Sequence, residues 1–168
     1  MLSDSLRVTT AHDLIAQEMA ALDERRWDDW LSLYDPQCEF WMPMWRDEET
    51  LTEDPQRELS HIYYRSRAGL EDRVLRIKSR QSASSLPLPR TAHAAGWVIA
   101  EPTSDADALV VRNSWSCHVF LPSTHESVVL FGLSRYEFSR GEGSWRIQRR
   151  KIRLDSEYIP TMADFYCL

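Results

Sequence analysis

Residues 27–55 read WDDWLSLYDPQCEFWMPMWRDEETLTEDP and contain four of the seven tryptophans of the chain. The first part is typical of the end of a helix, and Asp35-Pro36 predicts a turn because a residue before proline disfavours the α region. The following segment, Glu39–Trp45, predicts a strand with apolar side chains on both faces. Such a strand is covered on both sides. Helices are expected on one side, and what covers the other side bears on function.

Two helices are predicted before this strand. The sequence Thr10-Ala11-His12-Asp13 is typical of a capping box, in which the Thr10 hydroxyl accepts from the amide of Asp13. Residues 1–9 are therefore expected to form an arm outside the first helix. Apolar side chains recur after the box at helical spacing, namely Leu14, Ile15, Met19 and Leu22. A second, short helix is expected over residues 27–34.

The segments after the tryptophan-rich strand are less regular. Residues 46–55 are acidic and without hydrophobic periodicity, so an irregular loop is expected. Residues 58–64, ELSHIYY, predict a short strand, and residues 69–79, GLEDRVLRIKS, predict a helix. Residues 79–89 are rich in serine and proline and are interpreted as the connection into the next part of the fold.

From Arg90 onward the hydrophobic period is two, which predicts four long strands over residues 91–101, 107–121, 127–139 and 144–155. The turn sequences EPTSDA, PSTHE and RGEG join them into an antiparallel meander. Trp145 and Ile147 alternate on one face of the last strand, whereas Ile152 and Leu154 alternate on the other, which predicts a β-bulge between them. Helices followed by a curved sheet indicate an α+β cone, with the N-terminal helices packed on the sheet.

The bulk composition limits the classes of function. A chain of 168 residues with 43% hydrophobic and 27% charged residues is expected to form a single domain, 1–168. A net charge of −6 argues against nucleic acid as a partner. The basic run RIQRRKIR at residues 146–153 is interpreted as a solvent-facing strand. Without a signal peptide, a membrane-length apolar run or a C-x-x-C pair, the chain is expected in the cytoplasm, away from membranes.

The interior of a cone is either a pocket or a packed core. His93 alternates with Trp97 and Ile99, and Asn113 lies among the apolar positions of the next strand, so both are candidate polar groups of a cavity. Tyr34 and Asp35 are candidates for its mouth. A histidine and a carboxylate facing one cavity could act as an acid–base pair. We favour the alternative that His93 and Asn113 are hydrogen-bonded polar groups of the core or of an interface.

The pattern of histidines and cysteines does not indicate a metal site. A Rieske cluster needs closely spaced pairs of Cys and His. Cys117 and His118 are adjacent in a predicted strand and point to opposite faces, so they cannot chelate one ion. The five histidines show no i, i+4 pair, and no Walker sequence, nucleophile elbow or glycine-rich phosphate loop is present.

Several long segments resemble the small (β) subunit of aromatic-ring-hydroxylating dioxygenases, in particular the benzoate and anthranilate branch. They are LDERRWDDWLSLYDPQCEFWMPMW at residues 22–45, LTEDPQRELSHIYYRSRAGLEDRVLRIKS at 51–79, LPRTAHAAGWV at 88–98, SRYEF at 134–138 and EYIPTMADFYCL at 157–168. The order and spacing of these segments match the family from about the first helix to the C-terminus.

The resemblance implies a nuclear-transport-factor-like or cystatin-like cone without catalytic, cofactor-binding or metal-binding residues of its own. In that family the Rieske [2Fe-2S] cluster and the mononuclear Fe(II) lie on the large α subunit, and a separate reductase supplies electrons from NADH. Three α and three β subunits form a hexamer that contains a β homotrimer. The functional residues of this chain are then expected at interfaces. On physical grounds the candidates are Trp41, Trp45, Asp72, Arg73, Arg76, Arg149, Arg150 and Arg153. An ordinary solvated face would explain the charged ones nearly as well.

The leading hypothesis is therefore a non-catalytic structural β subunit of a benzoate 1,2-dioxygenase-type complex, which cis-dihydroxylates an aromatic carboxylate in aromatic catabolism. The alternative is a free-standing cone-fold dehydratase or isomerase that uses His93 and a carboxylate. A third hypothesis is an association or ligand-binding domain of the same fold. The sequence leaves the identity of the aromatic carboxylate open. An open, polar cavity would favour the enzyme, and a filled one would favour the subunit.

Overall fold

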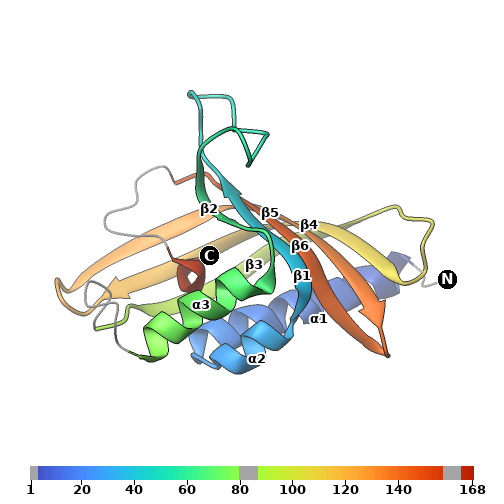
Figure 1. Cartoon of the computed structure of the whole chain (residues 1–168), viewed down its shortest axis with the longest axis horizontal. Coiled ribbons are helices and arrows are strands. Elements are labelled where there is room, and N and C mark those ends of the chain that lie inside the picture. Colours follow the sequence, from blue (N-terminus) through green and yellow to red (C-terminus); the bar gives the residue numbers. More distant parts are fainter. Residues whose placement is uncertain (1–3, 80–86, 157–163) are drawn as a thin grey trace.

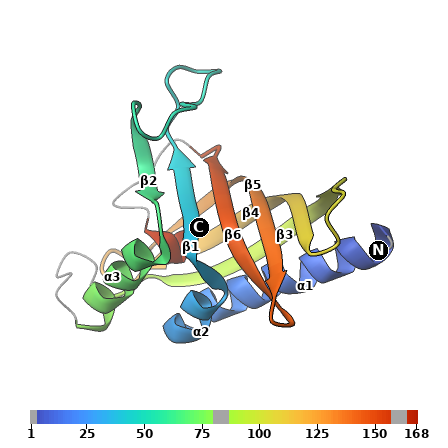
Figure 2. The same ribbon diagram turned by 45° about the vertical axis from the view of Figure 1, so that its right-hand side comes forward.

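The computed structural model describes residues 4–79, 87–156 and 164–168. The helices lie on one side of a single curved sheet, and a projecting loop rises from the other side (Figures 1 and 2). The elements in chain order are α1 Asp4–Asp23, α2 Trp27–Ser32, β1 Tyr34–Pro43, β2 Ser60–Tyr64, α3 Arg67–Lys78, β3 Arg90–Glu101, β4 Ala108–Leu121, β5 Glu126–Gly141, β6 Ser144–Leu154 and the 3₁₀ helix η2 Phe165–Cys167.

The sheet has the strand order β2-β1-β6-β5-β4-β3. Strands β3 to β6 form the antiparallel meander that the turn sequences predicted. Strand β1 pairs with β2 antiparallel and with β6 parallel, so the first strand of the chain lies beside the last. The predicted α+β class, with N-terminal helices on a curved and mostly antiparallel sheet, is confirmed.

Strand β1 differs from the prediction at its start. The turn expected at Asp35-Pro36 is wrong, because β1 begins at Tyr34 and continues through the proline. Its pairing with β6 is irregular between Tyr34 and Glu39, and this irregularity accommodates a residue that has no backbone N–H to donate. Beyond it Phe40, Trp41 and Met42 are all buried, so the prediction of a strand covered on both faces is confirmed.

Helix α1 begins before the predicted capping box. Residues 4–9 are helical, so the expected arm is wrong for these residues, and Thr10 lies inside the helix rather than at its start. The guanidinium of Arg7 donates to the carbonyl oxygens of Glu101 (3.4 Å) and Thr103 (3.5 Å). This contact with the end of β3 fixes the first turns of the helix, a tertiary effect that a local capping motif does not reveal.

Two β-bulges determine which side chains face the helices. In β6 the predicted bulge is confirmed: Arg149 pairs with Glu137 and Ile147 pairs with Phe138, which leaves Gln148 as the extra residue. Ile147 thereby joins Ile152 and Leu154 on the buried face. In β3 a second bulge was not predicted. Ala95 pairs with Trp115 and Val98 pairs with Asn113, so Gly96 and Trp97 together oppose Ser114.

The remaining predictions of local structure are mostly confirmed. The expected strand over 58–64 corresponds to β2, and the expected helix over 69–79 corresponds to α3. The acidic residues 46–55 are irregular apart from a bridge between Trp45 and Leu51. Most of the serine- and proline-rich connection, residues 80–86, lies outside the described residues.

Gly132 provides a direct test of how closely β5 approaches β6. A Cβ atom at this position would lie 1.9 Å from the carbonyl oxygen of Arg153, whereas a Cβ at Gly141 has no heavy atom within 4 Å. We expect Gly132→Ala to lower the free energy of unfolding by about 3 kcal/mol, in the range of overpacked interiors. Gly141→Ala is the matched control and should change it by less than about 0.5 kcal/mol. Urea unfolding measures both, and equal effects of the two substitutions would contradict the described packing of β5 on β6.

Candidate functional site

The inner side of the cone contains a buried cluster of charged and aromatic groups around Glu18 of α1. The Oε1 atom of Glu18 accepts from Trp30 Nε1 (3.3 Å), from Arg150 Nη1 (3.1 Å) and from the hydroxyl of Tyr34, and Oε2 accepts from the hydroxyl of Tyr136 (2.7 Å). All five side chains are at most 1% exposed. One carboxylate therefore connects α1, α2, β1, β5 and β6.

Aromatic rings cover the guanidinium of Arg150. Its carbon lies 5.1 Å from the ring centroid of Tyr136 and 5.6 Å from that of Phe40, within the range of cation–π attraction. Burial has the largest single effect and by itself lowers the pKa of Arg150, but Glu18, Tyr136 and Tyr34 together outweigh it and raise the pKa. Burial, together with the negative charge of Glu18, raises the pKa values of Tyr34 and Tyr136 well above the usual range. The cluster therefore holds one buried ion pair and two neutral phenols.

Arg150 is consequently not where the sequence analysis expected it. It was a candidate for contact with a partner subunit, but it lies inside the chain and its cation is paired with Glu18. The bulge at Gln148 is the physical reason, because it turns Arg150 to the inner face of β6. The sequence analysis did not identify Glu18. The signal was present, because Glu18 is a carboxylate within the apolar stripe of α1, between Ile15 and Leu22.

Breaking the buried pair should be far more costly than breaking an exposed one. Glu18→Gln leaves the Arg150 cation buried without a counter-ion, so we expect a loss of about 3–5 kcal/mol in the free energy of unfolding. Glu39→Gln, which removes the partly exposed pair with Arg149, is the control and should cost about 0–1 kcal/mol. Denaturant unfolding of the two variants measures the difference, and a loss below about 1 kcal/mol for Glu18→Gln would contradict the described role of the pair.

A second polar group lies on the inner face where α1 ends against β3. The Asp23 carboxylate accepts from the amide of His93 (2.9 Å) and the hydroxyl of Thr91 (2.9 Å), and its Oδ1 lies 2.6 Å from His93 Nδ1. The imidazole side chain is fully buried. The Nε2 atom of His93 has no hydrogen-bond partner. The His–carboxylate pair of the alternative hypothesis thus exists, and Asp23 is the carboxylate that sequence reasoning missed.

Asn113 also faces inward, as predicted. It is fully buried, and its Nδ2 donates to the carbonyl oxygen of Ser114 at 3.0 Å. Asn113 Oδ1, Trp115 Nε1 and Ser134 Oγ are further buried polar atoms without a hydrogen-bond partner. The predicted grouping of His93 with Trp97 and Ile99 is wrong, because the bulge in β3 turns those two apolar side chains to the outer face. Of the expected mouth residues, Tyr34 is fully buried in the Glu18 cluster, and Asp35 follows it in β1.

The ionisation of Asp23 gives a pH test of the contact between α1 and β3. Burial by itself raises the pKa of Asp23, but the bonds from the His93 ring and amide outweigh it, so the pKa is lowered. A lowered pKa stabilises the fold above the unfolded value of about 3.9, and this stabilisation is lost as the pH falls through the folded value. We therefore expect the difference in unfolding free energy between the native chain and Asp23→Asn to be largest above about pH 5 and to shrink in more acidic solution. Denaturant unfolding across this pH range measures it; a difference that persists unchanged at about pH 2.5 would contradict the role of the ionised carboxyl.

No cluster of three or more His, Cys, Asp or Glu side chains with the geometry of a metal site occurs within residues 4–79, 87–156 and 164–168. The three cysteines are buried, and none of them forms a disulfide bond. Burial is the main reason that the pKa of each thiol is raised, to about 12 for Cys38 and Cys167. No helix within the described ranges is both long and apolar enough to cross a membrane.

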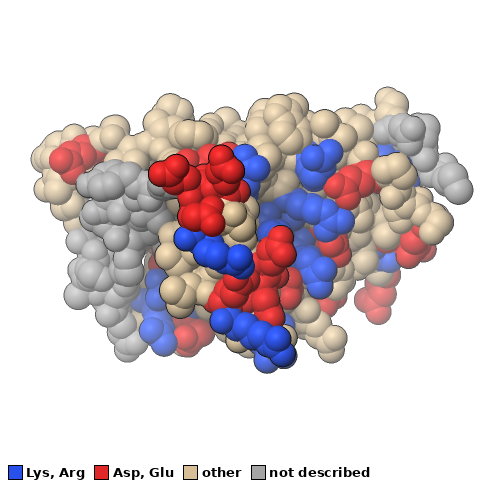
Figure 3. Space-filling model, turned by 90° about the horizontal axis from the view of Figure 1, so that it is seen from above, with Lys and Arg blue, Asp and Glu red and all other residues tan. Residues whose placement is uncertain are grey.

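The outer face of the sheet, opposite the helices, is charged over its middle strands. A continuous network starts with Glu39 of β1, which lies 3.0 Å from Arg149 of β6, and Arg149 also reaches Glu137 of β5 (3.6 Å). From Glu137 the network continues through Arg135, Glu101 and Arg112 to β4. Figure 3 shows the acidic and basic side chains intermingled on this face. Because each cation has a carboxylate neighbour, the middle of the face is polar without a single dominant sign.

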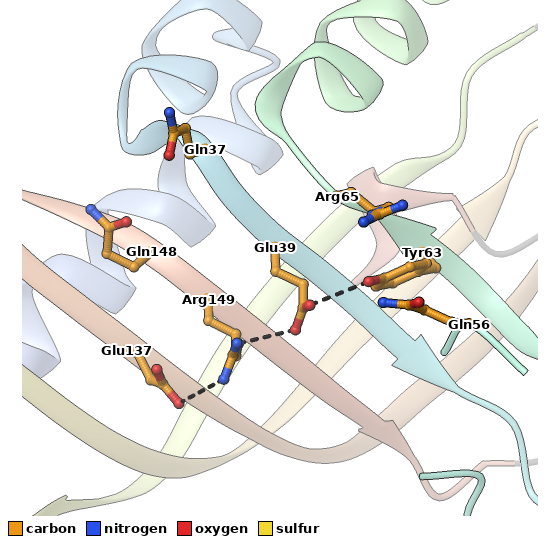
Figure 4. A pocket seen from close by; sticks show the side chains of 8 residues that line it. All are labelled: Gln37, Glu39, Gln56, Tyr63, Arg65, Glu137, Gln148 and Arg149. Carbon is orange, nitrogen blue, oxygen red and sulfur yellow. Dashed lines mark hydrogen bonds and ion pairs between the residues drawn. The ribbon is translucent and has the colours of Figure 1, made fainter. Parts of the chain in front are cut away.

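A depression of about 410 Å³ opens on this face between β1, β2 and β6 (Figure 4). Tyr63 donates to Glu39 at its centre (3.4 Å), beside the pair of Glu39 and Arg149. The depression is lined by polar side chains, namely those of Gln37, Glu39, Gln56, Tyr63, Arg65, Glu137, Gln148 and Arg149. A shallow, open surface of amide and charged groups is suited to contact with polypeptide rather than to enclosing a small substrate.

The other candidate interface residues lie in three places. Trp41 is buried, donates to Ser60 Oγ (2.9 Å) and is covered by the Lys151 ammonium 4.4 Å from its ring centroid. Trp45 donates to the carbonyl oxygen of Leu154 (2.6 Å), and Arg153, which pairs with Asp155, lies over its ring. Both tryptophans therefore connect the base of the projecting loop, residues 44–59 between β1 and β2, to the sheet.

The candidates on α3 divide between the interior and the surface. Asp72 and Arg76 form a partly exposed pair at 3.1 Å. Arg73 pairs with Asp164, a buried carboxylate that also accepts from the amide of Phe165 (2.8 Å) at the start of η2. Arg73 thus ties α3 to the C-terminal 3₁₀ helix within the subunit. Asp72, Arg76 and the exposed part of Arg149 remain available for contact with another chain.

Comparisons with known proteins agree with one another. The model of the "Ring hydroxylating beta subunit" family matches residues 17–161. The benzoate 1,2-dioxygenase subunit beta of Acinetobacter baylyi is 38% identical over 165 residues, which cover 98% of this chain and 96% of that protein. The crystal structure of the benzoate 1,2-dioxygenase beta subunit from Burkholderia mallei superimposes with a TM-score of 0.80 at 31% identity and covers both chains completely.

A more distant likeness concerns the fold alone. A putative scytalone dehydratase from Novosphingobium aromaticivorans has a TM-score of 0.66 at 13% identity, over 92% of this chain and 89% of that one. The cone shape is therefore shared with proteins outside the dioxygenases, whereas the sequence match is not. With a family model that spans most of its length and a relative of 38% identity over nearly all of it, this chain belongs to the ring hydroxylating beta subunit family.

Proposed function

We propose that this chain is the non-catalytic structural β subunit of an aromatic-ring-hydroxylating dioxygenase that acts on an aromatic carboxylate of the benzoate type. The observation that carries the proposal is the match, over nearly the whole chain, to the benzoate 1,2-dioxygenase subunit beta. The reaction would be cis-dihydroxylation of the ring, and the chain would form one domain over residues 1–168 of a complex in the cytoplasm.

The inner face of the cone supports a structural rather than a catalytic role. The Glu18 carboxylate, at the centre of this face, is bonded to Arg150, Tyr136, Tyr34 and Trp30, so both of its oxygens are occupied within the chain. The His93–Asp23 pair has the composition of an acid–base pair, but the imidazole is fully buried. A general base must come within hydrogen-bond distance of the proton that it removes. The dehydratase alternative is therefore the weaker proposal.

The partner of this chain would be the large α subunit, which would carry the Rieske cluster and the mononuclear iron, with NADH-derived electrons supplied by a separate reductase. The contribution of the β subunit would be geometric, since it would hold three α subunits in a closed ring within a hexamer of three α and three β chains. Its functional surfaces would then be outward-facing, such as the depression around Glu39 and Arg149 and the exposed side of α3 with Asp72 and Arg76.

Co-expression with a large subunit, sought among the neighbouring genes, tests this proposal. We expect the two chains to elute together at the mass of a hexamer, with iron bound to the large subunit only, and we expect the purified β chain to be colourless and inactive. Size-exclusion chromatography with light scattering and an iron assay measure both properties.

The same experiment distinguishes the dehydratase alternative. If the two proteins elute separately and the isolated chain converts a small substrate, with the activity lost in His93→Gln, the structural proposal is wrong. An iron-containing, coloured β chain would contradict it as well. Asn113→Ala is a suitable control for His93→Gln, because Asn113 is a buried polar residue of the same inner face.

A further inference from the structure

The last five residues of the chain, 164–168, which we refer to as the C-terminal segment, are packed inside the molecule. Phe165 and Leu168 are fully buried, and Tyr166 and Cys167 are at most 6% exposed. The 3₁₀ helix η2 of this segment contacts α1 and β3, and it lies beside α3 (Figures 1 and 2). The end of the chain is therefore part of the core and does not lie on the surface.

Three aromatic rings surround the ring of Phe165. It stacks on Trp30 of α2, with the ring centroids 4.5 Å apart and the planes at 19°. Trp27, also of α2, contacts it edge-on at 5.7 Å, and Tyr166 does so at 5.6 Å. Stacked and edge-to-face pairs at these distances attract each other beyond the effect of buried area. The inner side of α2 is therefore suited to bind a planar aromatic ring.

The residue before Phe165 supplies a carboxylate to a cation of α3. Asp164 pairs with Arg73, and the two side chains are 6% and 25% exposed. This bond is the main reason that the pKa of Arg73 is raised. The neighbouring charges Asp72 and Arg76 pair with each other at 3.1 Å, and Arg73 has no second ion-pair partner among the described residues. Without Asp164, a largely buried guanidinium would lack a counter-ion, which favours the binding of another carboxylate.

A ring and a carboxylate in adjacent positions are the two functional groups of an aromatic carboxylate. Trp27 and Trp30 of α2 hold the ring, and Arg73 of α3 holds the carboxylate. Sites for small molecules have this composition, with aromatic walls and one charged group that fixes the orientation. Such a site selects a ligand that carries both groups over a ligand that carries only one of them.

We propose that the space between α2 and α3 is a binding site for an aromatic carboxylate, which Asp164 and Phe165 occupy in this structure. The ring of a free ligand would replace that of Phe165 on Trp30, and its carboxylate would replace that of Asp164 on Arg73. Because the C-terminal segment belongs to the same chain, its effective concentration is on the order of millimolar, and a ligand has to compete with it at that level. The inference goes beyond the proposed function, and its test does not involve the large subunit.

The first experiment vacates the site in the full chain. Asp164→Ala/Phe165→Ala removes the competing carboxylate and ring and keeps the rest of the C-terminal segment. We expect this double variant to bind benzoate or 3-phenylpropionate, which differ in the spacing between ring and carboxylate, about tenfold more tightly than the native chain does. Isothermal titration calorimetry measures the dissociation constants. Acetate and benzyl alcohol, which carry only one of the two groups, should bind more weakly.

Arg73→Gln, added to the double variant, distinguishes a site for a carboxylate from a simple cavity. It should weaken the binding of the aromatic carboxylate by about tenfold or more, the contribution of a hydrogen bond to a charged group, and leave that of benzyl alcohol within about twofold. Arg76→Gln is the matched control, because Arg76 lies on the same helix and pairs with Asp72 instead. Binding that does not depend on Arg73, or no binding of either aromatic carboxylate to the folded double variant, would overturn the inference.

A measurement on the native chain decides the matter if the double variant does not fold. Displacement of the C-terminal segment would expose the thiol of Cys167, which is 3% exposed in the structure. We expect 3-phenylpropionate, in excess over the effective concentration of the segment, to accelerate alkylation of Cys167 by iodoacetamide several-fold. Alkylation of the buried Cys38 of β1 should stay unchanged, and acetate should have no effect. Mass spectrometry of the peptides measures both thiols. In that case an unchanged rate at Cys167, or an equal acceleration at Cys38, would contradict the inference.

Discussion

The ion pair between Glu18 and Arg150 is the interaction on which the rest of this structure depends. Both groups are almost completely removed from solvent, and an unpaired charge at either position would carry a large desolvation penalty. Glu18 is on the first helix and Arg150 is on the last strand, so the pair forms only when the two ends of the chain have come together. Tyr34 and Tyr136 complete the hydrogen bonds of the carboxylate, which leaves Glu18 without a free oxygen for chemistry.

The structure thereby separates the two faces of one sheet into different roles. Inward side chains, among them the pair of His93 and Asp23, join the helices to the strands. Outward side chains form a charged network and, on β3 and β5, an apolar surface. Two bulges set this division, since one turns Arg150 inward and the other turns Trp97 outward. The charged and apolar side chains that another chain could contact therefore lie on the outside of the cone.

Much of the fold follows from the sequence. Alternating strands with strong turn sequences predicted the meander, and the mismatch between Ile147 and Ile152 predicted the bulge in β6. The bulge in β3 left no such signal, because both Trp97 and Val98 are apolar and either register gives an apolar inner face. The parallel pairing of β1 with β6 depends on contacts between the two ends of the chain, which local patterns do not contain.

The functional residues were harder to predict than the fold. Asn113 was expected to be a buried polar group, and it is. In the sequence, Arg150 is one of several cations in the basic run at residues 146–153. Only the bulge at Gln148 shows that Arg150 is buried. Glu18 and Asp23 are single carboxylates on a helix, and their partners are 132 and 70 residues away in the chain. Contacts with the large subunit depend on the surface of that subunit, which this sequence does not encode, so they stay predictions.

Hydroxyl-radical footprinting of the isolated chain and of its complex with the large subunit would test the separation of the two faces most directly. The account predicts that Trp30 and Tyr34 are protected in both states, and that Trp97 and Phe131 are oxidised in the isolated, dissociated chain and protected after assembly. Oxidation of Trp30 and Tyr34 in the folded, isolated chain would show an open interior. That result, or an outer face that reacts equally in both states, would contradict the account.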